Sequence, residues 1–422
     1  MDSQGYLAFI QSKKKTIDDA GFDVNDLPSF LFNYQKTIVS KALKRGRFAI
    51  FAECGLGKTP MQLVWADQIA KHTGKPVLIL APLAVAAQTV REGAKFGIDV
   101  YHSRDGSYQR ITITNYEHID KYHAGKFAGI VLDESSILKN YAGKLRNEIT
   151  SFAKSIPYRL SATATPAPND FVEFGTQAEF LSICTHTEML ANYFVHDGGD
   201  TSKWRLKKHA VKDFKRWLNE WSINIDNPSD LGDSIEGFQL PKLNEVQVQI
   251  DTQRPDETLF EQVAISLSEQ RHQKRKYDED IANKVAEIVN GDDQQWLVWV
   301  ENNYEADSIR KLIPEAVEIR GSDKPEHKET AMMDFAADKI RVLITKPSIA
   351  GFGMNWQQCS NMVFSSLSHS YEQRYQAIRR CYRFGQRNQV NVYTIRYHGD
   401  DAISVNFNRK QVNADHIKSV EV

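Results

Sequence analysis

The sequence is poor in the features that mark disulfide-rich, zinc-binding and membrane-spanning proteins. Its 422 residues include only four cysteines, and no two of them form a C-x-x-C pair. They are Cys54, Cys184, Cys359 and Cys381. This spacing indicates neither a zinc ribbon nor a disulfide framework, and it suits free thiols in a reducing compartment. The most apolar segment, Val77–Ala87, is too short for a bilayer span and is broken by Pro82.

A net charge is also lacking. The chain has 53 lysine and arginine residues against 54 aspartate and glutamate residues, which gives a formal net charge of -1. It therefore has no overall attraction for nucleic acid, and any such binding has to come from a local patch. The Lys13–Lys15 run follows a weak apolar patch instead of preceding it, which is the reverse of a secretion signal. We therefore expect a cytoplasmic protein that does not contact membranes.

What the sequence has instead is an alternation of short apolar runs with segments of helix length. Such runs are typical of strands that are buried on both faces of a parallel sheet. In the first part of the chain they are Phe48–Ala52, Val77–Ala81, Ile111–Thr114, Ile130–Leu132 and Tyr158–Ala162. In the last part they are Glu245–Ile250, Trp296–Val300, Val317–Ile319, Val342–Ile344, Met362–Phe364 and Val390–Ile395. The sequence therefore predicts the α/β class, with two tandem domains of parallel strands flanked by helices.

The pattern changes between the two series. The segment Phe171–Phe238 is rich in aromatic and charged residues and shows no alternation of strands and helices. We expect a mostly helical insertion there. The expected division is a first domain over residues 1–170, the insertion over 171–239 and a second domain over 240–422.

The strongest single motif is the segment Ala52-Glu-Cys-Gly-Leu-Gly-Lys-Thr59, which lies between an apolar strand and an expected helix. A phosphate-binding loop needs this context. Glycines let backbone N–H groups approach phosphate oxygens, and the N-terminus of the following helix favours anions. Lys58 would reach the β and γ phosphates of ATP, and the Thr59 hydroxyl would bind Mg²⁺. Ala52 departs from the strict pattern, which begins with glycine.

An acidic pair follows a later strand, in the segment Ile130-Val-Leu-Asp-Glu-Ser-Ser136. Carboxylates at the carboxyl end of a buried strand are a natural second half of such a site. Asp133 would hold the metal, and Glu134 would orient the attacking water. The hydroxyl-rich segment Ser161-Ala-Thr-Ala-Thr-Pro166 ends another strand and would sense the γ-phosphate; the alternative is a simple turn before the proline.

Positive charge for this site would come from the segment Gln376-Ala-Ile-Arg-Arg-Cys-Tyr-Arg-Phe-Gly-Gln386. In a helix, Gln376, Arg380 and Arg383 would share one stripe, and Gly385 would end the helix. Arginines that reach across a cleft stabilise charge on a transferring phosphoryl group. A solvated basic helix is the alternative.

Taken in order, these residues resemble the superfamily-2 helicases, and among them the Swi/Snf-type DNA translocases, over about residues 31–396. Four further segments match the family's order: Leu31–Gln35, Ala81–Leu83, Thr114–Tyr116 and Ala350–Asn355. The resemblance implies two tandem RecA-like domains that bind ATP and Mg²⁺ in the cleft between them. The chain also resembles compact members of this family that phages and prophages encode. We therefore expect its source to be a bacterial cell or a phage-infected host.

The resemblance assigns a role to individual positions. Glu134, Arg383, Arg380, Lys58 and Asp133 would be catalytic. Gln35, Gly55, Gly57, Lys58, Thr59, Gly353 and Gln376 would bind the nucleotide, with Gln35 reading the adenine. Thr59 and Asp133 would hold the metal, and Pro82, Thr114 and Asn115 would contact nucleic acid. The sequence departs from the family at Arg379, where aspartate or glycine is usual, and in an acidic box that ends in Ser-Ser.

A basic and aromatic stretch within the expected insertion is a second candidate for nucleic-acid contacts. The segment Lys203–Trp217 has seven basic residues against Asp213 alone, and it includes Lys203, Trp204, Arg205, Lys207 and Lys208. Such a cluster in a near-neutral protein suits phosphate binding. The alternative is an amphipathic helix that packs its aromatic residues on the domain and keeps its lysines in water, and both can hold at once.

The sequence thus predicts an ATP-dependent DNA helicase or duplex translocase that reads no particular sequence. Three other classes compete with it: an RNA remodeller, a phosphate-loop kinase or small-molecule NTPase, and a scaffold that binds nucleic acid without turnover. The Arg-Phe-Gly-Gln ending at Gln386 and the lack of an Asp-Glu-Ala-Asp box argue against the first. The arginine segment in a second α/β domain argues against the second, and the intact Lys58, Asp133 and Glu134 argue against the third.

Overall fold

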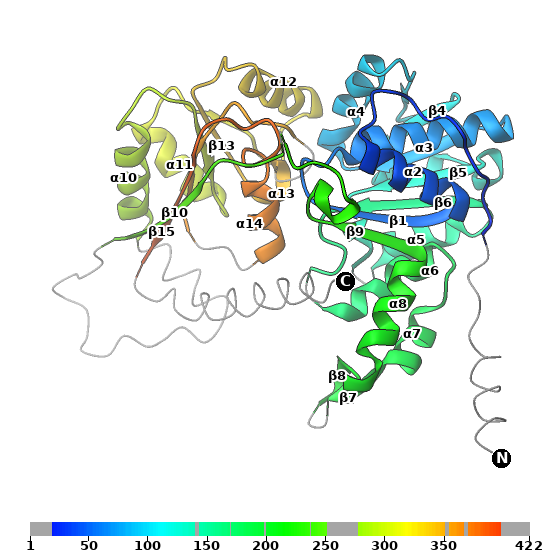
Figure 1. The fold of residues 1–422 in the computed structure, drawn as a ribbon. Coiled ribbons are helices and arrows are strands. Elements are labelled where there is room, and N and C mark those ends of the chain that lie inside the picture. Colours follow the sequence, from blue (N-terminus) through cyan, green and yellow to red (C-terminus); the bar gives the residue numbers. More distant parts are fainter. Residues whose placement is uncertain are drawn as a thin grey trace.

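Two parallel β-sheets, one from each half of the chain, form the centres of the protein (Figure 1). The computed structural model describes residues 19–139, 143–168, 170–197, 200–236, 238–250, 277–350, 354–366 and 370–397. Helices cover both faces of each sheet, so the predicted α/β class with two RecA-like domains is confirmed. Among the described residues, no helix is long and apolar enough to cross a membrane.

The first sheet has seven strands in the order β3-β4-β2-β5-β6-β1-β9, all parallel to their neighbours. In chain order the strands are β1 Arg47–Ala52, β2 Val77–Ala81, β3 Tyr101–His102, β4 Ile111–Asn115, β5 Gly129–Asp133, β6 Tyr158–Thr163 and β9 Ser222–Ile225. The helices are α2 Asn33–Arg45, α3 Lys58–Thr73, α4 Leu83–Lys95, α5 Lys144–Ala153, α6 Phe174–Phe180, α7 His186–Tyr193 and α8 Val211–Trp221. Short 3₁₀ turns are η1 Tyr116–Lys121, η2 Ala124–Lys126, η3 Ser135–Lys139, η4 Phe171–Glu173, η5 Lys208–Ala210 and η6 Pro228–Leu231.

Alternate side chains of the first sheet feed two cores. Phe48 and Ile50 of β1 pack with α2, α3 and α4 on one face, whereas Phe51 packs with α5 to α8 on the other. Burial on both faces explains why these strands read as continuous apolar runs.

The second sheet has six parallel strands in the order β10-β15-β14-β11-β13-β12. Its strands are β10 Leu243–Gln249, β11 Trp296–Trp299, β12 Val317–Glu318, β13 Val342–Thr345, β14 Asn361–Phe364 and β15 Val390–Arg396. Its helices are α10 Asp278–Val289, α11 Asn303–Leu312, α12 Pro325–Ala336, α13 Pro347–Ala350 and α14 Tyr371–Ile378. Here too the strands are sandwiched, since Trp296 packs with α10 and α11 while Trp299 packs with α12 and α14.

The segment between the two series contains strands as well as the expected helices. β7 (Phe194–Asp197) and β8 (Asp200–Leu206) form an antiparallel hairpin next to α7 and α8. β9 pairs with β1 at the edge of the first sheet, with Ile223 opposite Ile50. Because β9 has four residues and contains Asn224, no apolar run marks it in the sequence. We propose that residues 171–239 are an extension of the first domain.

Trp221 fastens this extension to the first sheet. It ends α8, is fully buried, and its ring meets the edge of Phe51 at a centroid distance of 6.1 Å. We expect Trp221→Ala to lower the free energy of unfolding by about 3–5 kcal/mol, because it empties a large part of the core. Chemical denaturation measures this loss. Lys212→Ala on the exposed face of α8 is the control, with a change within about 0.5 kcal/mol; equal losses in both variants would contradict the prediction.

Candidate active site

Three loops meet at the carboxyl edge of the first sheet. Strands β5, β6 and β1 are neighbours in that order, and they end at Asp133, Thr163 and Ala52. The carboxyl ends of parallel strands lie on the same edge, so the phosphate loop, the acidic pair and the hydroxyl-rich turn come together. The sheet order therefore assembles residues that are more than 100 positions apart in the sequence.

The phosphate loop leads directly into α3, which begins at Lys58. Gly55 and Gly57 have positive φ values of 95° and 72°, which glycine adopts without strain. The first N–H groups of a helix have no partner within the helix and favour an anion in front of them. The ammonium group of Lys58 donates to the carbonyl oxygen of Ala52 at 2.8 Å, so a positive charge also lies over the loop. The loop is thus suited to bind phosphate.

The acidic pair lies beside this loop and is mostly buried. The side-chain amide of Gln62 donates to Oδ1 of Asp133 at 2.7 Å. Burial, and next the negative charge of Glu134, raise the pKa of Asp133 to about 6. A cation would relieve that cost, and the oxygen donors of Asp133 and Thr59 suit a hard ion such as Mg²⁺.

Glu134 is held in an unusual backbone conformation and is tied to the next strand. Its φ is 55°, in the left-handed region that few residues other than glycine occupy. Its Oε2 accepts a hydrogen bond from the Thr163 hydroxyl at 3.2 Å, and that hydroxyl oxygen accepts the backbone N–H of Thr165 at 3.1 Å. Residues held in such regions cluster at functional sites. The hydroxyl-rich turn therefore contacts the carboxylate that was expected to orient water.

The second domain faces this edge with Arg380 and Arg383, but not from a helix as expected. Helix α14 ends at Ile378, and both arginines lie in the turns that follow. The predicted single helical stripe is therefore wrong. The carbonyl oxygen of Arg380 accepts the backbone N–H of Trp356 at 2.9 Å, which ties this segment to a neighbouring loop after the helix has ended.

The two arginines nevertheless converge. Nη1 of Arg380 and Nη1 of Arg383 each donate to the carbonyl oxygen of Met354 at 3.2 Å. Within the described part of the chain, no carboxylate forms an ion pair with either of them, and Nε of Arg383 has no hydrogen-bond partner. Burial, and next the charge of Arg380, lower the pKa of Arg383 to about 10. Arg380 is buried and Arg383 half-buried, and Arg380 also donates to the backbone oxygen and to Oε1 of Gln376 at 2.9 Å and 3.0 Å. Because all these acceptors are neutral, the two guanidinium groups favour an anion beside them.

A cavity of about 500 Å³ joins the two sets of residues. It is lined from the first domain by the phosphate loop, Asp133 and Glu134, and from the second by Arg380 and Arg383. An aromatic rim surrounds it, made of Phe30, Phe32, Tyr34, Phe96, Phe238 and Phe384. Three of these rings, Phe30, Phe32 and Phe384, are among the exposed large apolar side chains of the described residues. Exposed rings at the mouth of a polar pocket suit the flat face of a base.

The sequence did not identify this rim, because its members lie far apart in the chain. Phe238 comes from the segment before the second domain, and it stacks on Phe384 with ring centroids 4.6 Å apart. Gln35 lies among these rings, but both ends of its side-chain amide are engaged. Its oxygen accepts the N–H of Phe32 at 3.1 Å, and its nitrogen donates to the carbonyl of Leu56 at 3.1 Å. To bind the adenine as expected, the Gln35 amide would have to give up one of these two hydrogen bonds for one to the base.

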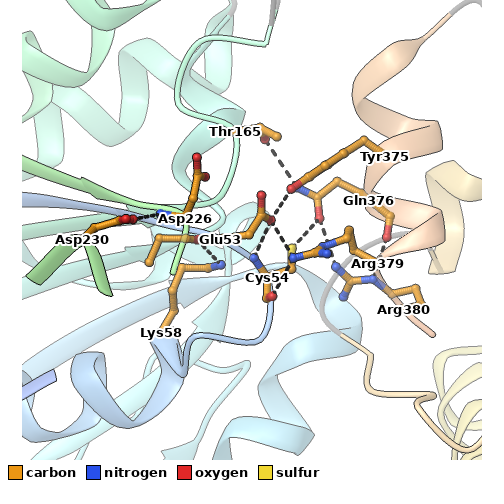
Figure 2. Close-up of polar contacts among 11 residues, drawn as sticks. Glu53, Cys54, Lys58, Thr165, Asp226, Asp230, Tyr375, Gln376, Arg379 and Arg380 are labelled. Carbon is orange, nitrogen blue, oxygen red and sulfur yellow. Dashed lines mark hydrogen bonds and ion pairs between the residues drawn. The ribbon is translucent and has the colours of Figure 1, made fainter. Parts of the chain in front are cut away.

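Two other residues, Gly353 and Gln376, were also expected to bind the nucleotide. Gly353 lies outside the described residues. Gln376 does not line the cavity; it bridges the domains instead, with its side chain within hydrogen-bond distance of Thr165 (3.4 Å) and of the Cys54 thiol (3.8 Å) (Figure 2). This makes Gln376 a contact between the domains.

The expected nucleic-acid contacts divide in the same way. Thr114 and Asn115 are fully buried at the end of β4, so this structure does not support a contact of their side chains with nucleic acid. Pro82 lines a second cavity of about 490 Å³ between the domains, together with Lys139, Lys328 and residues of α12. Glu134 lines both cavities, so the two spaces adjoin.

The basic stretch of the first domain combines both expected readings. Phe214 is fully buried, and Trp204 and Trp217 pack against the same core, so the aromatic residues are structural. Lys208 and Arg205 are exposed, whereas Lys207 donates to two carbonyl oxygens at the end of α7. The side chain of Lys203 lies outside the described part. In Figure 1 this region projects from the opposite end of the molecule to α12.

Comparisons with known proteins cover most of the chain. Residues 280–385 match the model of the helicase conserved C-terminal domain. The chain is 23% identical over 431 residues to the uncharacterized ATP-dependent helicase YqhH of Bacillus subtilis (strain 168), which covers 87% of this chain and 76% of that protein. It is 24% identical over 420 residues to the SWI/SNF-related matrix-associated actin-dependent regulator of chromatin subfamily A-like protein 1 homolog of Caenorhabditis elegans. That match covers 86% of this chain and 58% of that protein.

Among solved structures, the chain is similar to the Sulfolobus solfataricus SWI2/SNF2 ATPase core in complex with dsDNA. The two share 16% identity with a TM-score of 0.44, over 96% of this chain and 98% of that one.

The domain match and the two relatives agree with the resemblance drawn from the motifs. These matches support a superfamily-2 helicase of the Swi/Snf type, and with it a helicase-type ATP-dependent enzyme. Its kinship with phage-encoded members stays a prediction.

Substitution of Gly55 tests how closely the phosphate loop contacts the second domain. A Cβ atom at Gly55 would lie 2.8 Å from the backbone nitrogen of Phe384, whereas one at Gly74 would meet nothing within 4 Å. Both glycines have positive φ, so Gly55→Ala and Gly74→Ala should each cost about 1–2 kcal/mol of stability. Only Gly55→Ala should also abolish ATP hydrolysis, because it pushes Phe384 off the loop. Unimpaired hydrolysis in Gly55→Ala would show that this contact is dispensable.

Proposed function

We propose that the protein is an ATP-dependent DNA translocase or helicase that hydrolyses ATP in the cavity between its domains and moves along nucleic acid. One observation carries the proposal. Lys58, Asp133 and Glu134 of the first domain face Arg380 and Arg383 of the second across a single cavity of about 500 Å³. This is the arrangement that phosphoryl transfer requires, because that chemistry depends on positioning and on stabilisation of charge.

In this proposal the phosphates of ATP lie at the phosphate loop, where the N-terminus of α3 and Lys58 counter their charge. Glu134 accepts a proton from a water molecule as its oxygen attacks the γ-phosphorus, and ADP leaves. Arg380 and Arg383 stabilise the charge on the transferring group. Thr59 and Asp133 would hold Mg²⁺, which supplies further charge neutralisation when it is bound.

The link between hydrolysis and movement would run through the hydroxyl-rich turn. Thr163 bonds to Glu134, while the Thr165 hydroxyl donates to Glu372 of the second domain at 3.4 Å. Loss of the γ-phosphate next to Glu134 would therefore be felt at a contact between the domains. Such a two-state contact is what couples one site to a domain movement.

Nucleic acid would bind without reading sequence, since phosphate contacts carry affinity and no sequence information. One surface supports this part of the proposal. Lys208 of η5 and Lys212 and Arg216 of α8 are exposed and lie at helical spacing.

Glu134→Gln separates chemistry from binding. The amide keeps the shape of the side chain but accepts no proton, so we expect the steady-state rate of ATP hydrolysis to fall by more than about 100-fold. ATP affinity, measured by equilibrium binding, should stay within a few-fold of the native value. Retained turnover would remove Glu134 from the catalytic role.

The nucleic acid on which the enzyme acts can be identified from which polymer stimulates its ATP hydrolysis. The ATPase rate is measured alone and with single-stranded DNA, duplex DNA, forked DNA and RNA, in parallel with Lys58→Ala. We expect duplex or forked DNA to stimulate the native protein at least about tenfold and the variant not at all. Stimulation by RNA alone would identify an RNA remodeller. Nucleic-acid binding without any hydrolysis would identify a scaffold.

A further inference from the structure

A buried ion pair joins the phosphate loop to the second domain. Nη2 of Arg379 lies 3.1 Å from Oε1 of Glu53 and donates to the carbonyl oxygen of Cys54 at 2.9 Å. The same Oε1 accepts the backbone N–H of Cys54 at 2.7 Å and the hydroxyl of Tyr375. Figure 2 shows these side chains meeting between the two domains. One carboxylate oxygen of the first domain thus receives two donors from the second.

The pair is shielded from water. The side chains of Arg379 and Glu53 are 11% and 13% exposed, and the guanidinium lies near the rings of Tyr375 and Tyr382, at 5.9 Å and 5.6 Å. Burial is the largest single influence and lowers the pKa of Arg379, but Glu53, Tyr375 and Cys54 together outweigh it and raise the pKa. A buried charge without its partner is costly, whereas a pair with good geometry is held firmly.

Chain connectivity gives this pair a consequence for the active site. Arg379 directly precedes Arg380, and Glu53 lies two residues before Gly55 in the phosphate loop. All partners in the contact belong to the chain, so it needs no nucleotide to form. It also neutralises Glu53, a carboxylate that would otherwise repel phosphate from the loop. Arg379 is one of the positions at which the sequence departs from the family, and an aspartate there would face Glu53 with like charge.

We propose that Arg379 is a positioning residue: its ion pair with Glu53 docks the second domain on the phosphate loop, which places Arg380 and Arg383 opposite the γ-phosphate before ATP binds. This proposal rests on the proposed ATPase function, and it names what sets the geometry of that site. Tyr375 supports the same carboxylate oxygen.

Other ion pairs between the domains provide a comparison. Nη2 of Arg104, after β3, lies 2.8 Å from Oε1 of Glu329 on α12, and both side chains are 35% exposed. Ion pairs in water contribute little, because solvent screens them. Arg104→Ala is therefore a matched control that removes an ion pair across the same cleft without touching the phosphate loop.

The test uses the full chain with Arg379→Ala, Glu53→Gln and the double variant, and it measures ATP turnover together with small-angle X-ray scattering without nucleotide. Arg379→Ala should increase the radius of gyration, lower kcat at least about tenfold and raise the KM for ATP, because Arg379 no longer neutralises the Glu53 carboxylate. Glu53→Gln should lower kcat without raising KM. The double variant should recover KM and be no slower than either single variant, since both remove the same contact.

Several results would overturn the proposal. The first is an unchanged radius of gyration and kcat in Arg379→Ala. The second is a kcat of the double variant that falls by the product of the two single-variant factors. The third is a loss of kcat in Arg104→Ala as large as that in Arg379→Ala. Tyr375→Phe guards against a folding defect, since it removes only one hydroxyl and should shift kcat in the same direction by a smaller factor. If the native protein hydrolyses no ATP with any polymer, the proposed function fails, yet scattering of the same variants still decides whether Arg379 docks the domains.

Discussion

Two guanidinium groups, one buried and one half-buried, determine what the cleft between the domains can do. Arg380 and Arg383 share the carbonyl oxygen of Met354, and neither forms an ion pair with a carboxylate of the described residues. A neutral acceptor cannot offset two positive charges out of water, so this arrangement is costly until an anion arrives. The cavity in front of them leads to a phosphate loop that is also built for an anion. The binding of a polyanion would satisfy both sides at once.

The parallel sheets are what make this meeting possible. Backbone hydrogen bonds fix β5, β6 and β1 side by side, and their register places Asp133 opposite Ala162 and Phe51 opposite Thr163. The loops beyond these residues are then confined to one edge, whatever their own sequence. The hydrogen bond from Thr163 to Glu134 follows from that confinement. The chemistry of the first domain thus depends on strand order, while that of the second depends on where α14 stops.

The sequence predicted the parts of the molecule that depend on local patterns. The two series of apolar runs match the strands closely, because most of these strands are buried on both faces, and the phosphate loop carries its glycines at fixed spacing. Features that depend on tertiary contacts were not predictable. The strand β9 is too short to show a pattern, and the end of α14 at Ile378 is not marked by a breaker, since the glycine that could mark it, Gly385, comes seven residues later.

The candidate site shows the same division. Asp133 and Glu134 follow a strand in sequence and lie where expected, whereas the rim that Phe32, Phe238 and Phe384 form depends on contacts between distant segments. Thr114 and Asn115 illustrate the converse. Their motif placed them at a strand end, but only the packed sheet shows that their side chains are covered.

The ion pairs between the domains have opposite polarity beside the two cavities. Beside the phosphate loop, the second domain supplies the cation and the first the carboxylate, as in the pair of Arg379 with Glu53. Around the second cavity the order is reversed, because Lys139 of the first domain pairs with Glu372 of the second. A phosphate that binds between Lys58 and the arginines adds a bridge between the domains. A phosphate that binds Lys139 has to replace a carboxylate of the other domain, and therefore removes one. In the proposed function, anions at the two cavities would therefore act on domain closure with opposite sign, and binding at one would favour release at the other.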